Sequence, residues 1–246
     1  MNAEAFFAEA RKQFGRLSQS QVDGINAILN ATEGRKRSHV AYLLATAWHE
    51  TARTMQPVRE TLAGSDAQAV ARLDRAWKAG KLKQVKVPYW RFDDTGRTWL
   101  GRGYVQLTHK DNYRKAAALV GVDLLGNPSL ALRADIAARI LVEGCEVGLF
   151  TGKKLADYLP GDYVNARKIV NGLDKAQAIA AHAVAFEAAL RAGGYGERRM
   201  QKTPPAAKKP ASGTKSGLAA ILGLLFAGLA YVLADFAGWI SKLFGG

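Results

Sequence analysis

The sequence predicts a mainly α domain with at most a small hairpin, followed by a linker and a C-terminal transmembrane helix. Apolar residues spaced three and four apart, together with long Ala-rich stretches, dominate residues 1–200 and favour helices. Residues 201–215 are rich in Pro, Lys and Ala, and residues 216–241 are largely apolar. We therefore expect a soluble domain at 1–200, a linker at 201–215 and a membrane helix at 216–241.

The helices expected in the first region follow from this apolar spacing and from glycine stops at Gly121 and Gly193. Residues 85–107 are the exception, because they are rich in aromatic, β-branched and turn residues, and they predict a long loop with a short hairpin. The expected helices are 3–14, 19–32, 39–55, 67–79, 110–120, 130–150, 163–170 and 175–192.

The C-terminal region predicts a tethered membrane helix. Prolines among Lys, Ala and Ser in the linker leave too little apolar surface to fold. From Ser216 to Ala234 the chain carries no charge, and at about 1.5 Å per helical residue this run matches a hydrocarbon layer of roughly 30 Å. The alternative is a core helix of the soluble domain.

Charges flanking this helix predict its orientation. Lysines crowd its N-terminal side and only Lys242 follows it, which favours a tail-anchored protein in a bacterial inner membrane with a cytoplasmic domain. Small residues at Ala219, Gly223 and Ala227 would allow helix-mediated self-association.

Overall charge and cysteine content narrow the function classes. The net charge of +14 attracts polyanions of any kind, including nucleic acid, anionic lipid and cell-wall polymers. Cys145 is the one cysteine, so the chain forms no internal disulfide. Glu4 and Glu9 interrupt the apolar residues at the N-terminus, where no secretory signal is apparent.

Glu50 is the first candidate for chemistry. It falls on the apolar stripe of the expected helix 39–55, two turns after Leu43, so its carboxyl group should point inward. Helix-end carbonyl groups and partial burial both raise the cost of ionising it, and a carboxyl group that keeps its proton can serve as a general acid. The alternative is a buried Glu paired with Arg53 or Arg59.

Glu60 is the second candidate. It lies beyond Pro57, which should end the helix and return the chain toward Glu50. Inverting glycosidases hold two carboxyl groups roughly 6.5–9.5 Å apart, with room for a water. Alone, Glu60 is more typical of a solvated loop charge.

A metal site is not indicated. His49 and Glu50 begin a zinc-protease pattern, but Arg53 stands where the second His is needed. The remaining histidines are scattered, so we expect no metal and no cofactor.

Three segments in order resemble glycoside hydrolase family 19, the chitinase class that includes many bacteriophage endolysins. They are AWHETA with Glu50, GRGYVQLTHKDNY from 101 to 113, and ARKIVNG from 166 to 172. The resemblance covers about the first 195 residues. It implies a lysozyme-like helical domain with glycosidase activity and no cofactor.

The resemblance also implies roles for individual residues: Glu50 as general acid, Glu60 as general base and Thr108 in positioning the attacking water. Gln106, Asn112 and Asn171 match substrate-binding positions, although such residues can instead satisfy loop backbone groups. Asp174 aligns with a family acid only across a gap, since this chain reads NGLDK. Tyr89, Trp90, Trp99 and Tyr104 could offer faces to sugar rings, and some of them should be core.

Together these features predict an inverting glycosidase that cleaves β-1,4 bonds next to N-acetylhexosamine, with bacterial peptidoglycan during phage-type lysis as the expected substrate. Chitin oligomers are the alternative substrate. A rival of another class is a membrane-permeabilising lytic protein. Charge alone also allows nucleic-acid binding, but no specific nucleic-acid partner is expected.

Overall fold

The computed structural model describes residues 1–83 and 85–196. In these ranges the protein is mainly α, as predicted, with a single two-stranded antiparallel sheet in which Val58 lies opposite Gly103. The elements are α1 (Ala3–Phe14), α2 (Gln19–Ala31), α3 (Arg37–Glu50), β1 (Val58–Arg59), η1 (Glu60–Leu62), α4 (Asp66–Lys78), β2 (Arg102–Gly103), α5 (Lys110–Val120), η2 (Pro128–Leu132), α6 (Ala134–Val147), η3 (Leu155–Asp157), α7 (Tyr163–Ala166), η4 (Arg167–Ile169) and α8 (Ala176–Ala192).

Helix α3 ends at Glu50 and not at residue 55, which the apolar pattern predicted. The chain then turns, with left-handed backbone at Arg53 and Met55. The turn packs tightly against α2, because a Cβ at Gly24 would lie only 1.6 Å from the Met55 carbonyl oxygen. The turn after α3 can adopt this close approach only because residue 24, distant in sequence, is a glycine.

Two other expected helices are each divided in the structure. The 130–150 segment forms η2 and α6, separated by Arg133 in an extended conformation, and the 163–170 segment forms α7 and η4. Apolar spacing does not distinguish a 3₁₀ turn from an α turn, so the sequence did not reveal these breaks.

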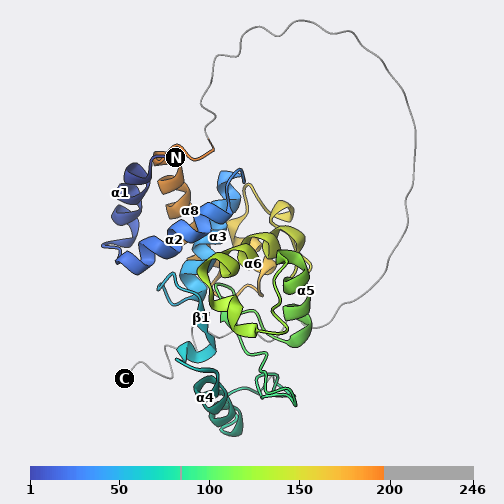
Figure 1. Ribbon diagram of the computed structural model, residues 1–246. Coiled ribbons are helices and arrows are strands. Elements are labelled where there is room, and N and C mark those ends of the chain that lie inside the picture. Colours follow the sequence, from blue (N-terminus) through green and yellow to red (C-terminus); the bar gives the residue numbers. More distant parts are fainter. Residues whose placement is uncertain (84, 197–246) are drawn as a thin grey trace, which may run out of the picture.

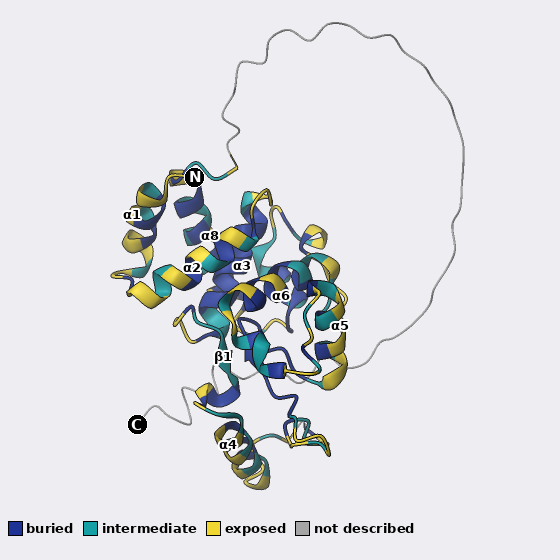
Figure 2. Ribbon diagram, in the orientation of Figure 1, coloured by how far each residue is buried: buried dark blue, intermediate teal, exposed yellow. Residues whose placement is uncertain are grey.

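Helix α3 forms the centre of the core. Every residue from 38 to 48 is buried, and α3 packs against α8 and α2 (Figures 1 and 2). The expected one-sided apolar stripe is therefore wrong, because a helix enclosed on all sides needs no polar face. Glu50 is placed where this buried helix ends.

Helix α4 and residues 79–83 and 85–100 form a separate unit, the α4 lobe, at one end of the molecule (Figure 1). It has a small core of its own, made by Ala69, Leu73, Val85, Trp90 and Leu100 together with Ala63, which precedes α4. Asp66 ties the lobe to the sheet by accepting hydrogen bonds from Arg59 Nε at 2.7 Å and Arg102 Nη2 at 2.6 Å.

The hairpin expected within residues 85–107 is only partly correct. An isolated bridge joins Arg102 to Leu107, but β2 itself pairs with β1, more than forty residues earlier in the chain. Such long-range pairing is not evident from local turn residues.

None of the helices in the described ranges is both long and apolar enough to cross a membrane. The predicted linker at 201–215 and transmembrane helix at 216–241 lie outside the described residues.

Candidate active site

Glu50 is the last residue of α3, and its side chain is 9 % exposed. Its Oε1 accepts a hydrogen bond from Arg167 Nη1 at 2.5 Å, and the Arg167 side chain is 3 % exposed. The carboxyl group therefore points inward, as expected from the sequence. Its ionic partner is Arg167, and not Arg53 or Arg59, which the alternative interpretation of a structurally paired Glu had named.

The segment ARKIVNG brings Arg167 to this position. Arg167 begins η4 directly after α7, and its carbonyl accepts the Asn171 N–H at 3.0 Å, which closes a tight turn. Asn171 is 5 % exposed and accepts the Gly172 N–H at 2.7 Å. Asp174 reaches Arg167 through its backbone carbonyl, which accepts from Arg167 Nε at 3.2 Å.

Glu60 is 4 % exposed and begins η1, immediately after β1. Its Oε1 accepts the Tyr89 hydroxyl at 2.7 Å and its Oε2 accepts the Gly101 N–H at 2.7 Å. Burial raises the pKa of Glu60 and outweighs these two hydrogen bonds and the positive charge of Arg102, which lower it. Glu60 is thus not the solvated loop charge that its position alone would suggest.

The backbone around Glu60 is specialised to hold it. The Glu60 N–H donates to the Gly101 carbonyl at 2.7 Å, and Thr61 adopts a left-handed conformation. A Cβ at Gly101 would lie 2.7 Å from Gln106 Oε1 and 3.3 Å from Glu60 Oε2, so only glycine fits without displacing its neighbours. The sheet therefore places one backbone donor directly on the carboxylate.

Arg102 holds the backbone next to Gly101 in place. Its buried guanidinium donates to the Thr98 carbonyl at 3.0 Å, to the Tyr113 hydroxyl at 2.8 Å and to Asp66. These contacts fix the chain on both sides of Gly101.

The polar candidates after Gly101 are mostly buried. Gln106 is 2 % exposed, and its Nε2 donates to the carbonyls of Val58 at 3.1 Å and Gly103 at 3.3 Å. It therefore satisfies backbone groups of the sheet, the alternative that the sequence left open. Thr108 is 5 % exposed, and Asn112 is half-buried in the first turn of α5.

Two of the aromatic candidates for sugar stacking belong to the core. Tyr104 has no exposed surface, and Trp99 is 6 % exposed, with its ring 5.4 Å from that of Tyr113 and its Nε1 donating to Asp93. Neither ring offers an open face in this structure, which corrects the assignment of both as substrate-binding. Trp90 is likewise fully buried. From sequence, an aromatic side chain in a loop can be either core or binding surface.

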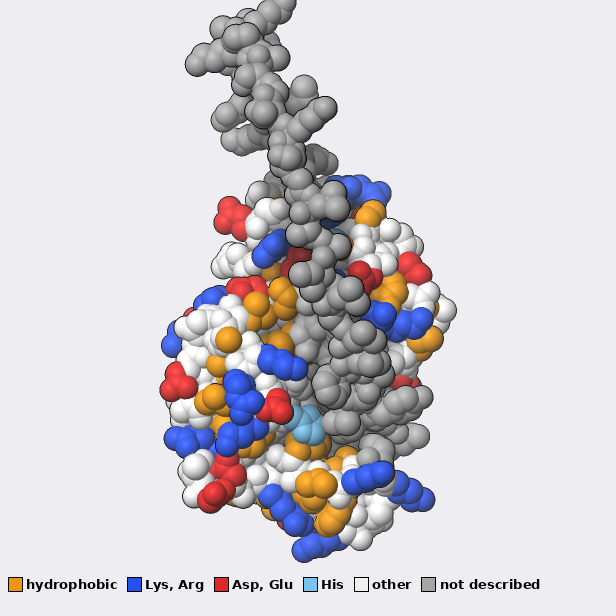
Figure 3. All heavy atoms as spheres, turned by 90° about the vertical axis from the view of Figure 1, so that its right-hand side faces the viewer, with side chains coloured by type: hydrophobic (Ala, Val, Ile, Leu, Met, Phe, Trp, Pro, Cys, Tyr) orange, Lys and Arg blue, Asp and Glu red, His pale blue; other side chains and the backbone are white. Residues whose placement is uncertain are grey.

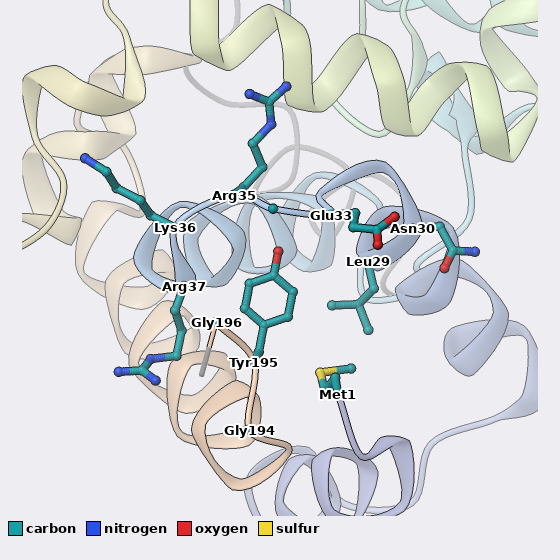
Figure 4. A pocket seen from close by; sticks show the side chains of 11 residues that line it. Met1, Leu29, Asn30, Glu33, Arg35, Lys36, Arg37, Gly194, Tyr195 and Gly196 are labelled. Carbon is teal, nitrogen blue, oxygen red and sulfur yellow. The ribbon is translucent and has the colours of Figure 1, made fainter. Parts of the chain in front are cut away.

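A pocket of about 380 Å³ lies beside β1 and borders the chain on both sides of Glu60. It is lined by Thr54, Pro57, Val58, Arg59, Leu62, Ala63 and Leu132. A second pocket, of about 880 Å³, is formed by the start of α3, the end of α2 and the residues after α8 (Figure 4). No candidate residue lines the second pocket.

Two contacts of the site were missed from the sequence. Arg167 lies within the ARKIVNG segment, but no local pattern paired it with Glu50. Tyr89 was expected as a sugar platform, and no local pattern identified it as a hydrogen-bond donor to Glu60.

A comparison with known protein families supports the glycosidase that the sequence predicted. The sequence model for glycoside hydrolase family 19, described as chitinase class I, matches residues 18–140, which include Glu50 and Glu60. Arg167 and Asn171 lie beyond the matched residues, so the match is shorter than the resemblance expected from the motifs. No curated protein matches the chain. The chain belongs to glycoside hydrolase family 19 and is a glycosidase of the chitinase class.

Proposed function

We propose that this glycosidase hydrolyses β-1,4 bonds next to N-acetylhexosamine by single displacement, with Glu50 as general acid and Glu60 as general base. The observation that carries the proposal is that two carboxyl groups are held at fixed positions by different donors. A water that attacks the anomeric carbon gives its proton to Glu60, and Glu50 gives a proton to the departing sugar oxygen.

The contacts of Glu50 suit an acid whose orientation must be fixed. Arg167 pairs with Oε1, so we assign Oε2 as the oxygen that carries the proton when Glu50 acts as the acid. The Arg167 contact and the near-complete burial of the Glu50 side chain restrict its orientation, which helps to hold it in a productive geometry.

The environment of Glu60 suits a base. A raised pKa brings a carboxylate closer to the working pH and makes it a stronger proton acceptor than an exposed Glu. Thr108 and Asn171 keep the roles that the family resemblance implies, in positioning water and binding substrate.

The family supports a chitin-type polysaccharide as substrate. Within that class we propose bacterial peptidoglycan, cleaved by an enzyme of the endolysin type. The support is electrostatic, since a chain of net charge +14 concentrates on anionic wall polymers. The face in Figure 3 carries Lys and Arg side chains on both flanks of a hydrophobic patch at its lower end, where the α4 lobe lies.

The test is reducing-end release from purified peptidoglycan and from soluble N-acetylglucosamine oligomers. Glu50→Gln and Glu60→Gln should each lower kcat by about 10²- to 10⁴-fold, the usual contribution of a general acid or base. Glu143→Gln, which removes a half-buried carboxylate paired with Arg139 on α6, should leave the rate unchanged. Full activity in either site variant would refute the two-carboxylate mechanism.

Analysis of the products tests the stereochemistry of the reaction and the identity of the substrate. Newly formed reducing ends should have the anomeric configuration opposite to that of the cleaved bond, which NMR detects before mutarotation. Faster release from N-acetylglucosamine oligomers than from peptidoglycan would favour chitin and reject the endolysin proposal.

We also propose that residues 216–241 anchor the enzyme in a bacterial inner membrane, with the catalytic domain on the cytoplasmic side. The support is the charge-free run from Ser216 to Ala234 and its lysine-rich N-terminal flank. Cys145 is buried, so a Ser212→Cys variant provides one accessible thiol in the linker. In intact spheroplasts this thiol should resist a membrane-impermeant maleimide, and labelling there would reverse the proposed topology.

A further inference from the structure

The α4 lobe donates one hydrogen bond, from the side chain of Tyr89, to the proposed general base Glu60. The Tyr89 hydroxyl donates to Glu60 Oε1 at 2.7 Å, while Gly101 N–H, from the segment that leads into β2, donates to Oε2. The carboxylate is therefore held between two parts of the protein. We propose that Tyr89 is a positioning residue, through which the lobe orients the general base; the inference rests on the proposed function of Glu60.

Tyr89 is itself held firmly within the lobe. Its ring lies edge-on to Trp90, with centroids 5.1 Å apart, and its other neighbour is the His109 ring at 4.4 Å. Trp90 is fully buried and its Nε1 donates to Asp74 of α4 at 2.9 Å. The hydroxyl is thus aimed by packing and not by solvent, as an effective positioning group requires.

Two donors on different oxygens fix the plane of the Glu60 carboxylate. Each oxygen can accept more than one hydrogen bond, so a lone pair on each is left for the attacking water. With only the Gly101 donor, the carboxylate could rotate and lose its alignment with the water.

The hydroxyl acts as a permanent donor. Burial and the neighbouring Glu60 raise the pKa of Tyr89 well above its ordinary value, so it stays protonated while Glu60 titrates. During attack the proton of the water passes to Glu60, and Tyr89 neither gains nor loses one. Its hydrogen bond favours the ionised base and lowers the Glu60 pKa against the effect of burial.

The charged and titratable groups around this contact come from both sides. His109 contacts Tyr89, and burial lowers the pKa of His109. Arg102, paired with Asp66 and hydrogen-bonded to Tyr113, lowers the Glu60 pKa through its positive charge. A pH test must therefore separate the effect of Tyr89 from that of His109.

The experiment is the pH profile of kcat/KM for Tyr89→Phe on an N-acetylglucosamine oligomer, in the full-length chain. Because the lost donor favoured the carboxylate, the ascending limb should move to higher pH, by on the order of one unit. KM, and oligomer affinity in a Glu50→Gln background, should stay unchanged. Tyr163→Phe is the matched control, because that hydroxyl donates to Glu187 at the same 2.7 Å and should leave the limb in place.

A fluorinated tyrosine at position 89 tests the same idea without removing the hydroxyl. Its stronger donor should move the limb to lower pH, which keeps the proposal testable even if Tyr89→Phe folds poorly. His109→Gln should not move the limb.

Other results would overturn the inference. A raised KM and weaker oligomer binding with an unmoved limb would make Tyr89 a sugar contact. If His109→Gln moves the ascending limb of the pH profile, the limb reports the titration of His109 and not that of Glu60. If Glu60→Gln keeps full activity, the proposed function itself fails, and that outcome is seen without any Tyr89 variant.

Discussion

The two proposed catalytic carboxyl groups are held in opposite ways. Glu50, at the end of α3, is bound by the guanidinium of Arg167, and both side chains are nearly buried. Glu60, beside the sheet, is bound by two neutral donors, the Tyr89 hydroxyl and the Gly101 N–H. Glu50 is therefore held by an ion pair, and Glu60 is held by hydrogen bonds from uncharged groups.

This difference indicates what each environment does to a proton. Burial without a direct ionic partner raises the pKa of Glu60, which strengthens it as a base. At Glu50 the Arg167 guanidinium binds one oxygen of a side chain that is 9 % exposed. The environment of Glu50 therefore mainly sets the orientation of the acid, and the environment of Glu60 mainly sets the proton affinity of the base.

The sharpest way to break the comparison is to remove the charge at the acid. Arg167→Met leaves the Glu50 carboxylate buried without a partner, and breaking a buried pair in this way typically costs about 3–5 kcal/mol. Urea denaturation of the full-length chain near neutral pH should show this loss. The double variant Glu50→Gln/Arg167→Met should recover part of it, because no uncompensated charge remains.

An exposed pair provides the control for that experiment. Arg133 and Asp135 lie 2.8 Å apart with side chains more than half exposed, so Arg133→Met should cost no more than about 1 kcal/mol. Equal losses for Arg133→Met and Arg167→Met would mean that burial does not distinguish the two pairs, and the contrast drawn between acid and base would fail.

Most of the fold followed from local pattern. Helices α1 and α5 begin and end where apolar spacing and glycine stops predicted, since both are amphipathic surface helices. The errors arose where distant residues contribute: the turn that follows the end of α3 packs on α2, where Gly24 leaves room for the Met55 carbonyl. Pairing of β1 with β2 likewise depends on segments far apart in the chain.

The site was predicted less completely. The inward direction of Glu50 was predicted correctly, although the one-sided stripe used to predict it was not, and its partner Arg167 lies 117 residues away in sequence. Tyr104 and Trp99 were misassigned because composition does not separate a core ring from a binding ring. Gln106 showed the same ambiguity, and its amide serves the backbone of the sheet.

The smallest expected effect is the pH dependence that Glu60 gives to the free energy of unfolding, and it tests the environment of the proposed base directly. Folding raises the pKa of Glu60, so the folded state binds this proton more tightly than the unfolded chain does. The associated stability is fully present below the unfolded pKa and is lost as pH rises through the folded value. Glu60→Gln has no such proton, so its free energy of unfolding relative to the wild type should rise with pH across that window. Urea titrations at several pH values measure this difference, and a difference that falls with pH would mean that the carboxylate is stabilised by its surroundings, as in an ordinary ion pair.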